Sequence, residues 1–467
     1  MSVVIETQLD LAGQVLDLVR AAAGPEAEAE VAVDRNELAL TRFANSYIHQ
    51  NVADATTGVR LRLHLGGRTA TGATTVIAGD ALRDLVERTV AASRLSPLDP
   101  GWPGLAPPAP TATAGSVDEA TAQASPAARA ERVAAFVAAI GDLVGAGYCR
   151  TMYHTAAFAN SAGQSVSGAT TEAAMDGIAR TASSDGVARL ASTRLADIDG
   201  AVLGARAAAK ARAGTDPVEL PPGRYEVVLE HAAVVDLLAN LAVWGFNGRA
   251  VVERRSFVEL GAQQMDPAVT LVDDATAPGR IGLPFDAEGT PKRRIELVTA
   301  GVSRSVVHDR RTAKMAGAES TGHAVPGGSA WGALPLHVTL APGAGADGGP
   351  VSEVDGPPAD SSVAALVADV ARGLLVTDSW YTRVLDPRPV VVTGLTRNGV
   401  WLIENGEIVR AVRNLRFTQA YPQALAPGNV LGVGTHAIAV PGDWGPESFM
   451  APALRLASWN YTGGASG

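Results

Sequence analysis

The strongest local constraint on the fold of this chain is the pair Asn405-Gly406, which stands between two alternating apolar runs. A two-residue hairpin turn needs both central residues at positive φ, and Asn followed by Gly adopts this backbone at little cost. Residues 400–411 are therefore expected to form an antiparallel hairpin. Other strand-like runs in this half are residues 225–229, 295–302 and 336–340. The second half is thus predicted to be a mostly antiparallel β domain with a few helices.

The first half mixes helical and strand periodicities. Apolar residues recur at helical spacing in residues 8–23 and again in residues 80–93. The segments that alternate like strands are residues 28–34, 37–46 and 58–65, the first two arranged like a hairpin around Arg35-Asn36. Because these strands follow one another without intervening helices, the predicted fold class is α+β rather than a parallel α/β sheet.

The length and two Pro- and Gly-rich segments predict the domain organisation. At 467 residues the chain is longer than one hydrophobic core usually grows, so two domains are expected. Residues 96–125 are dense in Pro, Gly, Ala and Thr and are expected to be a connector without regular structure. The domain boundary is placed at residues 215–223, between a predicted helix and a strand. This divides the chain into an N-terminal α+β domain (1–220) and a C-terminal β-rich domain (221–467).

The charge balance and the cysteine count exclude some classes of function. The formal net charge is −10 and the pI about 5.4, whereas a nucleic-acid surface needs clustered Lys and Arg. The one cysteine, Cys149, suits a reducing cytosol and is expected to be a buried structural thiol. No secretory leader or membrane span is recognisable. The protein is therefore predicted to be cytoplasmic, with neither nucleic acid nor a membrane as a partner.

Two short motifs resemble nucleotide-binding or catalytic signatures without meeting their requirements. Residues 343–348 match G-x-G-x-x-G, but Gly349-Pro350 follows where a dinucleotide site needs the start of a helix. Residues 163–167 lack the final Gly of the G-x-S-x-G nucleophile elbow. Neither a nucleotide site nor a serine hydrolase is therefore predicted.

Four carboxylates form the first polar cluster that could carry chemistry. Asp273, Asp274, Asp286 and Glu288 lie within 16 positions of one another. Such a cluster can bind a hard cation or transfer protons, and it can equally stabilise turns or a subunit contact. The neighbouring Pro and Gly residues favour the structural interpretation.

The second polar cluster is Ser320-Thr321-Gly322-His323. It joins two hydroxyls, a glycine that allows close approach of the backbone, and an imidazole that can titrate near neutral pH. Contact with a substrate and a loop histidine with satisfied hydrogen bonds are the two interpretations of this segment.

The spacing of the histidines bears on a zinc site. Two imidazoles can share one zinc from a helix when they stand about four residues apart, with a Glu beside them to activate water. The chain has eight histidines, and even the closest two, His323 and His337, are too far apart for one helical face. Neither a catalytic residue nor a metal ligand is therefore assigned to this chain.

Several phrases of the sequence, in one order, resemble the TldD/PmbA family over nearly the whole chain. They are Thr41-Arg42-Phe43-Ala44-Asn45-Ser46, Asn160-Ser161-Ala162-Gly163, Asp273-Asp274, Phe285-Asp286-Ala287-Glu288-Gly289-Thr290, Ser320-Thr321-Gly322 and Arg397-Asn398-Gly399. In that family a zinc peptidase subunit (TldD) pairs with a metal-free relative (TldE, also called PmbA). The resemblance implies a C-terminal metallopeptidase-like domain and places residues 320–323 near the peptide-binding cleft.

The resemblance also implies which branch of the family the chain represents. The zinc subunit carries His-Glu-x-x-x-His and a third-ligand Cys near its C-terminus. Here the corresponding stretch offers Glu230-His231 without a second His, and residues 431–456 offer only His436 and Asp443 in place of the Cys. The chain therefore resembles TldE. No cofactor is expected in it, and zinc is expected in a TldD-like partner subunit.

The implied function is that of a non-catalytic subunit in a bipartite peptidase that cleaves unfolded or leader-bearing peptides. The resemblance implies that the peptide is held in a cavity between subunits by main-chain pairing. Two alternatives stay open. One is a homodimeric hydrolase with an unconventional site drawn from His231, His323, His436 and the acids of residues 273–288. The other is a peptide-binding or scaffold protein, such as a gyrase modulator.

Assembly is expected through the C-terminal half, as a heterodimer with a TldD-like subunit or as a homodimer. Large aromatic side chains are enriched at the centres of interfaces because they bury much area with few rotatable bonds. The candidates in this half are Trp331, Trp380, Tyr381, Trp401 and Trp444.

Overall fold

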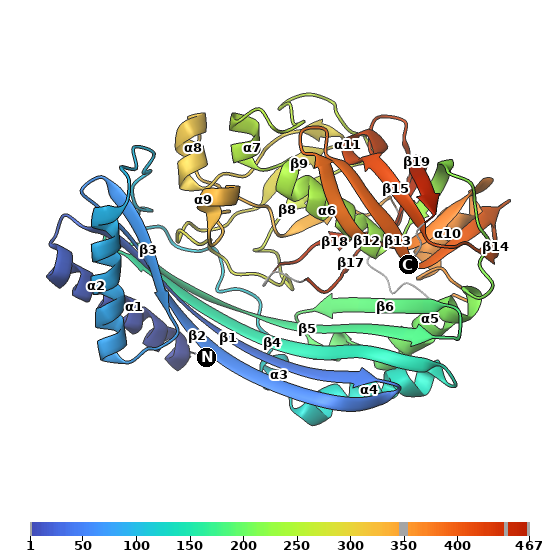
Figure 1. Ribbon diagram of the computed structural model, residues 1–467, viewed down its shortest axis with the longest axis horizontal. Helices are drawn as coiled ribbons and strands as arrows, with labels where there is room; N and C mark the ends of the chain where they lie inside the picture. The colour runs from blue at the N-terminus through green and yellow to red at the C-terminus, as the bar shows by residue number, and fades with distance from the viewer. Residues whose placement is uncertain (1, 345–353, 443–446, 465–467) are drawn as a thin grey trace.

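The computed structural model describes residues 2–344, 354–442 and 447–464. A long, curved sheet runs along the lower part of Figure 1, with helices against its outer face and the C-terminal half of the chain in its hollow. Helices and extensive, mostly antiparallel sheets are both present, which confirms the α+β class. Residues 345–348 of the glycine-rich motif, Asp443 and Trp444 lie outside the described ranges.

Six strands from the first half form one side of a 12-stranded sheet. They are β1 (Glu28–Ala44), β2 (Tyr47–Leu65), β3 (Arg68–Thr74), β4 (Val144–Asn160), β5 (Ser165–Arg180) and β6 (Asp185–Ser192). Their spatial order is β6-β5-β4-β1-β2-β3, and each of these neighbouring pairs is antiparallel. Because side chains alternate along a strand, one face of this sheet meets the helices and the other meets the C-terminal half.

Two groups of helices cover the outer face (Figure 1). One group is α1 (Ser2–Ala23) with α2 (Gly79–Leu95), and the other is α4 (Pro126–Ile140) with α5 (Gly200–Ala213). Odd-numbered residues of β1 point toward them: Val31 packs in the core under the first group, and Phe43 contacts Phe136 of α4. Cys149 is buried in the core under the second group, as predicted.

The predicted turn at Arg35-Asn36 is wrong. β1 continues through these residues, and the chain turns at Asn45-Ser46, where φ is 51° and 62°. The polar residues are tolerated because the middle of β1 is only partly buried, while β2 and β4 pair with its backbone on both sides. The predicted strand at residues 58–65 is the second part of the longer strand β2.

Most of the predicted connector, residues 96–125, lacks regular structure, as expected, but the short helix α3 (Glu119–Ala122) interrupts it. The segment is also tied to the sheet. The backbone N–H groups of Ala169 and Thr171, on β5, donate to the carbonyls of Ala114 and Ser116 at 2.9 and 3.0 Å. The connector thus supplies hydrogen-bond acceptors to the part of β5 that does not pair with β6.

The second half of the chain extends the first sheet. The added strands are β8 (Leu271–Asp273), β9 (Ile295–Thr299), β10 (Val302–Ser303), β11 (Val338–Leu340), β17 (Ile438–Ala439) and β18 (Met450–Ala451). The link between both parts is the pairing of Ala439 on β17 with Ala191 on β6. The predicted boundary at residues 215–223 follows α5, and one sheet takes strands from both sides of it. The division into two domains stays a prediction.

The second sheet is a closed ring of pairings, β12-β7-β19-β15-β13-β12. Its strands are β7 (Gly223–Leu229), β12 (Arg372–Asp386), β13 (Val391–Glu404), β15 (Leu415–Ala420) and β19 (Leu454–Gly464), with β14 (Glu407–Ala411) and β16 (Val430–Val433) attached. Apolar residues of α6 (His231–Trp244) belong to one hydrophobic core beside this sheet, and apolar residues of α10 (Ser361–Ala368) belong to a second one. The remaining helices are η1 (Leu195–Asp197), α7 (Gly248–Val252), α8 (Arg310–Ala316), α9 (Gly328–Trp331) and α11 (Tyr421–Ala424).

The predicted hairpin at residues 400–411 is present. β13 and β14 pair around Asn405 and Gly406, which have φ of 53° and 80°. Trp401, on β13, is completely buried and donates from Nε1 to the carbonyl of Ala213 at 3.0 Å. This aromatic therefore belongs to the core, and its selection as an interface candidate is wrong.

A buried ion pair joins α5 to the start of α6. Lys210 Nζ donates to Glu230 Oε2, and each side chain is 3% exposed. Glu230 Oε1 also accepts the backbone N–H of Ala359 at 2.8 Å. Burial lowers the pKa of Lys210, against the attraction of the Glu230 carboxylate. Glu230 thus compensates a cation that the interior would otherwise disfavour.

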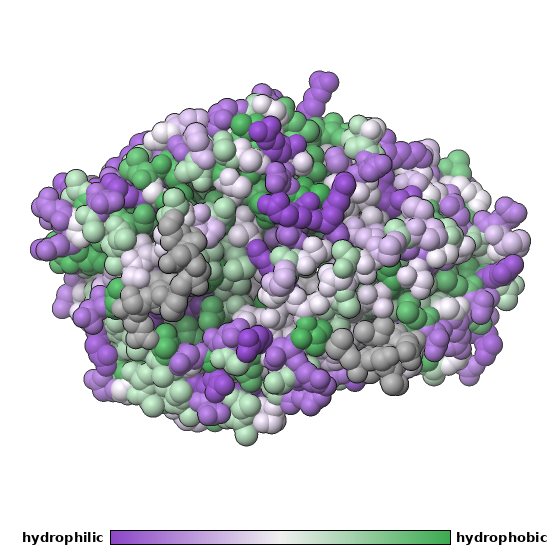
Figure 2. All heavy atoms as spheres, turned by 180° about the vertical axis from the view of Figure 1, so that it is seen from behind, coloured by the Kyte–Doolittle hydropathy of each residue, from purple (hydrophilic) through white to green (hydrophobic). Residues whose placement is uncertain are grey.

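The helices in the described ranges lack the combination of length and apolar composition that spanning a bilayer requires. Even the longest of them, α1, carries Glu6, Asp10, Asp17 and Arg20 along its 22 residues. On the face of the molecule in Figure 2, hydrophobic residues stand in separate groups among hydrophilic ones.

The Glu230→Gln variant should have a free energy of unfolding lower by about 3 kcal/mol, because it leaves the buried ammonium of Lys210 without its counter-ion. The double variant Lys210→Met/Glu230→Gln should recover part of this loss. Urea unfolding followed by circular dichroism measures both. A double variant less stable than Glu230→Gln alone would contradict the compensation.

Candidate functional site

A pocket of about 500 Å³ lies between the hollow face of the first sheet and the C-terminal half. The sheet contributes mainly even-numbered residues, which point away from the helices: Ala32 and Asp34 of β1, Arg60 of β2, and His154, Ala156 and Phe158 of β4. The opposite wall is mostly apolar, and its apolar residues are Val243, Leu283, Phe285, Ala287, Ala324, Val325, Pro326, Trp331, Leu334 and Leu336. A concave, largely apolar surface with a few polar groups is the usual form of a ligand site.

Asp286 shapes the loop that closes the pocket. Its Oδ1 accepts the backbone N–H groups of Glu288 and Thr290, and its Oδ2 accepts that of Ala324, all at 2.9 Å. Burial and the neighbouring Glu288 carboxylate raise the pKa of Asp286 to about 7, against the lowering effect of these three donors. One side chain therefore joins two separate segments of the pocket wall.

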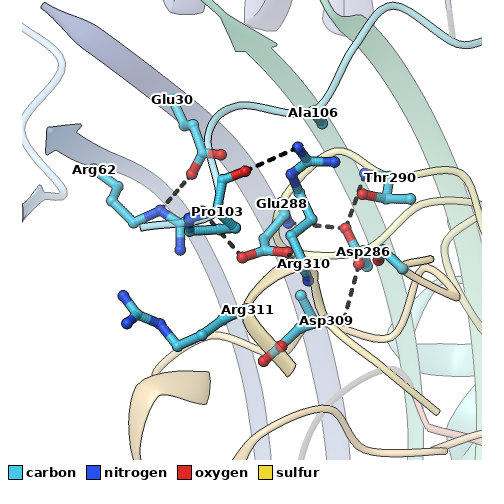
Figure 3. Close-up of polar contacts among 12 residues, drawn as sticks. Glu30, Arg62, Pro103, Ala106, Asp286, Glu288, Thr290, Asp309, Arg310 and Arg311 are labelled. Atoms are coloured by element: carbon cyan, nitrogen blue, oxygen red, sulfur yellow. Dashed lines mark hydrogen bonds and ion pairs between the residues drawn. The ribbon is translucent and has the colours of Figure 1, made fainter. Parts of the chain in front are cut away.

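Glu288 ties the same loop to the sheet (Figure 3). Its Oε1 accepts a hydrogen bond from Arg62 of β2 at 3.1 Å, and its Oε2 accepts the backbone N–H of Arg310 at 2.9 Å. Arg62 also pairs with Glu30 of β1, whose pKa is raised by burial against the attraction of Arg62. The Arg310 guanidinium donates to the carbonyl of Gly104 in the connector. This network fixes the loop, the sheet and the connector against one another.

Asp273 lies at the centre of a second buried network. Its Oδ1 is 2.9 Å from His323 Nε2, and its Oδ2 accepts the backbone N–H of His337 at 2.8 Å. His323 Nδ1 lies 3.0 Å from Thr321 Oγ1. Burial alone would raise the pKa of Asp273, but the attraction and hydrogen bond of His323 lower it below its usual range. Asp273 is therefore held as a carboxylate behind the pocket wall.

The predicted substrate segment, residues 320–323, lies behind the pocket rather than along it. The pocket lining begins one residue later, at Ala324. Thr321 and His323 are buried, and the hydroxyls of Ser320 and Thr321 donate to the carbonyl of His308. At Gly322, with φ of 76°, a Cβ would lie 2.5 Å from the carbonyl oxygen of Pro291. The segment therefore positions the wall through its backbone.

Sequence reasoning missed the polar residues that do line the pocket, among them Arg60, Lys292 and His337. Lys292 stands in the basic stretch Pro291-Lys292-Arg293-Arg294, where no site is predicted from the sequence. The loop of Asp286 closes through the pairing of Phe285 with Pro291, and the next residue, Lys292, lines the pocket. No periodicity in the sequence signals this placement.

The remaining family-motif residues near the pocket and the β1–β2 turn have structural contacts. Gly289 has φ of 72°, and a Cβ there would lie 2.2 Å from the Phe158 ring. Asp274 Oδ1 accepts the backbone N–H of Thr276 at 2.9 Å. Arg42, Asn45 and Ser46 lie at the β1–β2 turn, outside the pocket lining, where Ser46 Oγ accepts the backbone N–H of Gly145 at 2.9 Å.

Arg397, Asn398 and Gly399 lie on β13, at a different cleft of about 670 Å³. The Arg397 guanidinium lies 4.3 Å from the ring centroid of Trp380. Asn398 donates to Asp378, which is buried and paired with Arg189 of β6. The structure thus separates these residues from the pocket that Asp286 and Glu288 help to build.

Among the described residues, the donor groups do not fit the zinc that a metallopeptidase requires. His231 Nε2 is 3.2 Å from the carbonyl of His436 and 3.5 Å from Asp360 Oδ2. Burial, against the attraction of Asp360, lowers the pKa of His231 to about 4. Burial also raises the pKa of the Cys149 thiol to about 11. Within the described ranges, no three His, Cys, Asp or Glu side chains are arranged to hold a metal ion.

Asp273→Asn should lower the free energy of unfolding at pH 7 by about 2 kcal/mol, because His323 loses a charged acceptor. Folding lowers the pKa of Asp273, so its contribution is present above about pH 4, the unfolded-state pKa, and decreases as the pH falls. The difference between wild type and variant should therefore shrink at pH 3. Urea unfolding at both pH values measures it, and an undiminished difference at pH 3 would contradict this assignment.

Three solved structures share the fold over nearly the whole chain. One is TldE from Thermococcus kodakarensis, with a TM-score of 0.82, 18% identity, and coverage of 96% of this chain and 100% of that one. The others are described as proposed modulators of DNA gyrase. The protein from Thermotoga maritima has a TM-score of 0.80, 18% identity and coverage of 96% and 100%. The protein from Bacteroides thetaiotaomicron has a TM-score of 0.80, 17% identity and coverage of 97% and 98%.

Sequence comparison agrees with the fold. A curated relative named metalloprotease, from Methanothermobacter thermautotrophicus, is 26% identical over 232 residues. The match spans 46% of this chain and 44% of the relative, less than half of its length. Residues 222–463 match the PmbA/TldA metallopeptidase C-terminal domain, and residues 29–93 match the PmbA/TldA metallopeptidase domain 1. Because the first match alone covers more than half of the chain, this protein belongs to the PmbA/TldD metallopeptidase family.

Proposed function

We propose that this chain is a TldE-like, non-catalytic subunit of a bipartite zinc peptidase. The observation that carries the proposal is the composition of α6, the helix after β7, where the metal motif of the zinc subunit would fall. Its one histidine, His231, is held by Asp360 and His436. Its buried positions are otherwise apolar, namely Ala233, Val234, Leu237, Leu238, Leu241 and Ala242, each at most 1% exposed.

In this proposal a TldD-like partner supplies His-Glu-x-x-x-His, the third ligand and zinc, which activates water for hydrolysis of a peptide bond. This chain supplies part of the cavity wall. The apolar lining of its pocket suits the side chains that an unfolded or leader-bearing peptide exposes. The edge strand β3 offers backbone groups for main-chain pairing. We place the complex in the cytoplasm, where the lone Cys149 stays reduced.

We propose that the partner docks on the bulge of β12, the strand that carries Trp380 and Tyr381. These side chains are 49% and 64% exposed, and Tyr381 has φ of 51° where the β12–β13 register shifts. The guanidinium groups of Arg397 and Arg383 lie 4.3 Å from the two ring centroids. Exposed Trp, Tyr and Arg on a backbone irregularity are typical of interface centres and of functional sites. Trp331 is also exposed, at 54%, but lies at the pocket.

Coexpression with a TldD-like protein of the same host tests the subunit role. Cleavage of an unfolded peptide should require both chains, and zinc should be found at about one atom per heterodimer and below one atom per chain in the isolated subunit. The matched control is a complex in which the Glu of the partner's His-Glu-x-x-x-His is replaced by Gln. That complex should assemble and bind peptide without cleaving it.

Two other outcomes would favour the alternative functions. One tightly bound zinc in the isolated chain, with peptidase activity that His323→Ala abolishes, would indicate a homodimeric hydrolase. Peptide binding without cleavage in the presence of each TldD-like protein of the host would indicate a binding or scaffold protein. Elemental analysis and a peptide-cleavage assay distinguish all three.

The double variant Trp380→Ala/Tyr381→Ala should weaken association with the partner by about 1,000-fold, because such residues each contribute about 2 kcal/mol at an interface centre. Tyr47→Ala is the matched control, since Tyr47 is an equally exposed aromatic at 60% on β2. Sedimentation velocity across a range of concentrations measures both. Equal affinities for the two variants would show that the partner docks elsewhere.

A further inference from the structure

The pocket contains an amine without a counter-ion. Lys292 lines the pocket, and its Nζ has one polar contact within the described residues, at 3.5 Å from His337 Nδ1. Its side chain makes no ion pair there, although the acids Asp34, Asp286 and Glu447 line the same pocket. Lys292 is only partly buried, and the cavity that it lines is walled mainly by apolar side chains.

The two carboxylates that attract Lys292 most are committed to other groups. Asp273 is bonded to His323 and to the backbone of His337, and Asp286 accepts three backbone N–H groups. Both act on the Lys292 amine from beyond ion-pair distance. Neither can turn toward it without abandoning the contacts that hold the pocket wall.

A cation in such a place is destabilised. Burial lowers the pKa of Lys292, against the attraction of Asp273 and Asp286, because the surroundings do not replace the water that solvates an ammonium group. An anion that enters the pocket and contacts Nζ would restore the charged form and form a strong, charge-assisted hydrogen bond. The apolar wall requires that this anion be carried by an apolar body.

We propose that this pocket binds a carboxylate attached to an apolar group, with Lys292 as its counter-ion. The volume of about 500 Å³ falls within the range of small-molecule and peptide-end sites. Two sources offer this chemistry: a peptide whose last residue is apolar, and a free acid with a short hydrocarbon chain. The proposal concerns the isolated chain, so it stands or fails independently of the partner subunit.

Binding to the isolated wild-type chain should distinguish both the charge and the source. Titration calorimetry compares four probes, with the intrinsic tryptophan fluorescence, to which the pocket residue Trp331 contributes, as a second readout. They are octanoate, octanamide, N-acetyl-leucyl-phenylalanine with a free carboxylate, and the same dipeptide as its C-terminal amide. One acid or both should bind about ten-fold or more tightly than the matching amide, as a charged hydrogen bond predicts. The acid that binds more tightly identifies the source.

Lys292→Met should remove the preference for the acid over the amide, and Lys292→Arg should keep part of it. Lys314→Met is the matched control, because Lys314 is exposed on α8 and donates to the carbonyl of Trp102, outside the pocket. It should keep the full preference. The proposal is wrong if wild type binds neither acid, if acid and amide bind equally, or if the preference persists in Lys292→Met. The wild-type comparison decides the matter even if the Lys292→Met chain does not fold.

Discussion

The two-residue period of the long strands is the constraint on which the rest of the structure depends. On β1, odd-numbered residues such as Val31 and Phe43 are buried under the helices, so the even-numbered ones must face the C-terminal half. A shift of one residue would exchange the two faces, bringing Glu30 and Asp34 under the helices. The same register that stabilises the outer core therefore also provides the floor of the pocket.

The buried acids serve mainly to hold this pocket together. Asp273, Asp286 and Glu288 come from one short stretch of sequence. Asp273 and Asp286 are bonded to the adjacent residues His323 and Ala324, whereas Glu288 is bonded to Arg62 of β2. A buried carboxylate is costly unless hydrogen bonds satisfy it. Here these hydrogen bonds join residues that are far apart in the sequence. Rigid walls follow from this arrangement. A rigid pocket needs little ordering when a ligand binds, which favours affinity.

The family of this chain suggests metallopeptidase chemistry, whereas the side chains of α6 do not offer the ligands for it. The fold is that of a metallopeptidase family, whereas the buried positions of α6 are aliphatic apart from one histidine that is already hydrogen-bonded. Function depends on the groups that a fold presents rather than on the fold itself. A wall-forming subunit with its own carboxylate pocket would give such a chain a role in choosing substrate while the chemistry stays in its partner.

The sequence by itself determined the features that depend on neighbouring residues. The hairpin at Asn405-Gly406, the α+β class and the lack of a helical histidine pair follow from local backbone preference and spacing. The turn predicted from the sequence at Arg35-Asn36 is wrong, because pairing of β1 with β2 and β4 overrides a weak turn signal. Tertiary structure alone decided that Lys292 faces a pocket while Asp273 and Asp286 are committed elsewhere. The charge environment of a buried group is set by residues far apart in the chain, and sequence spacing does not encode their distances.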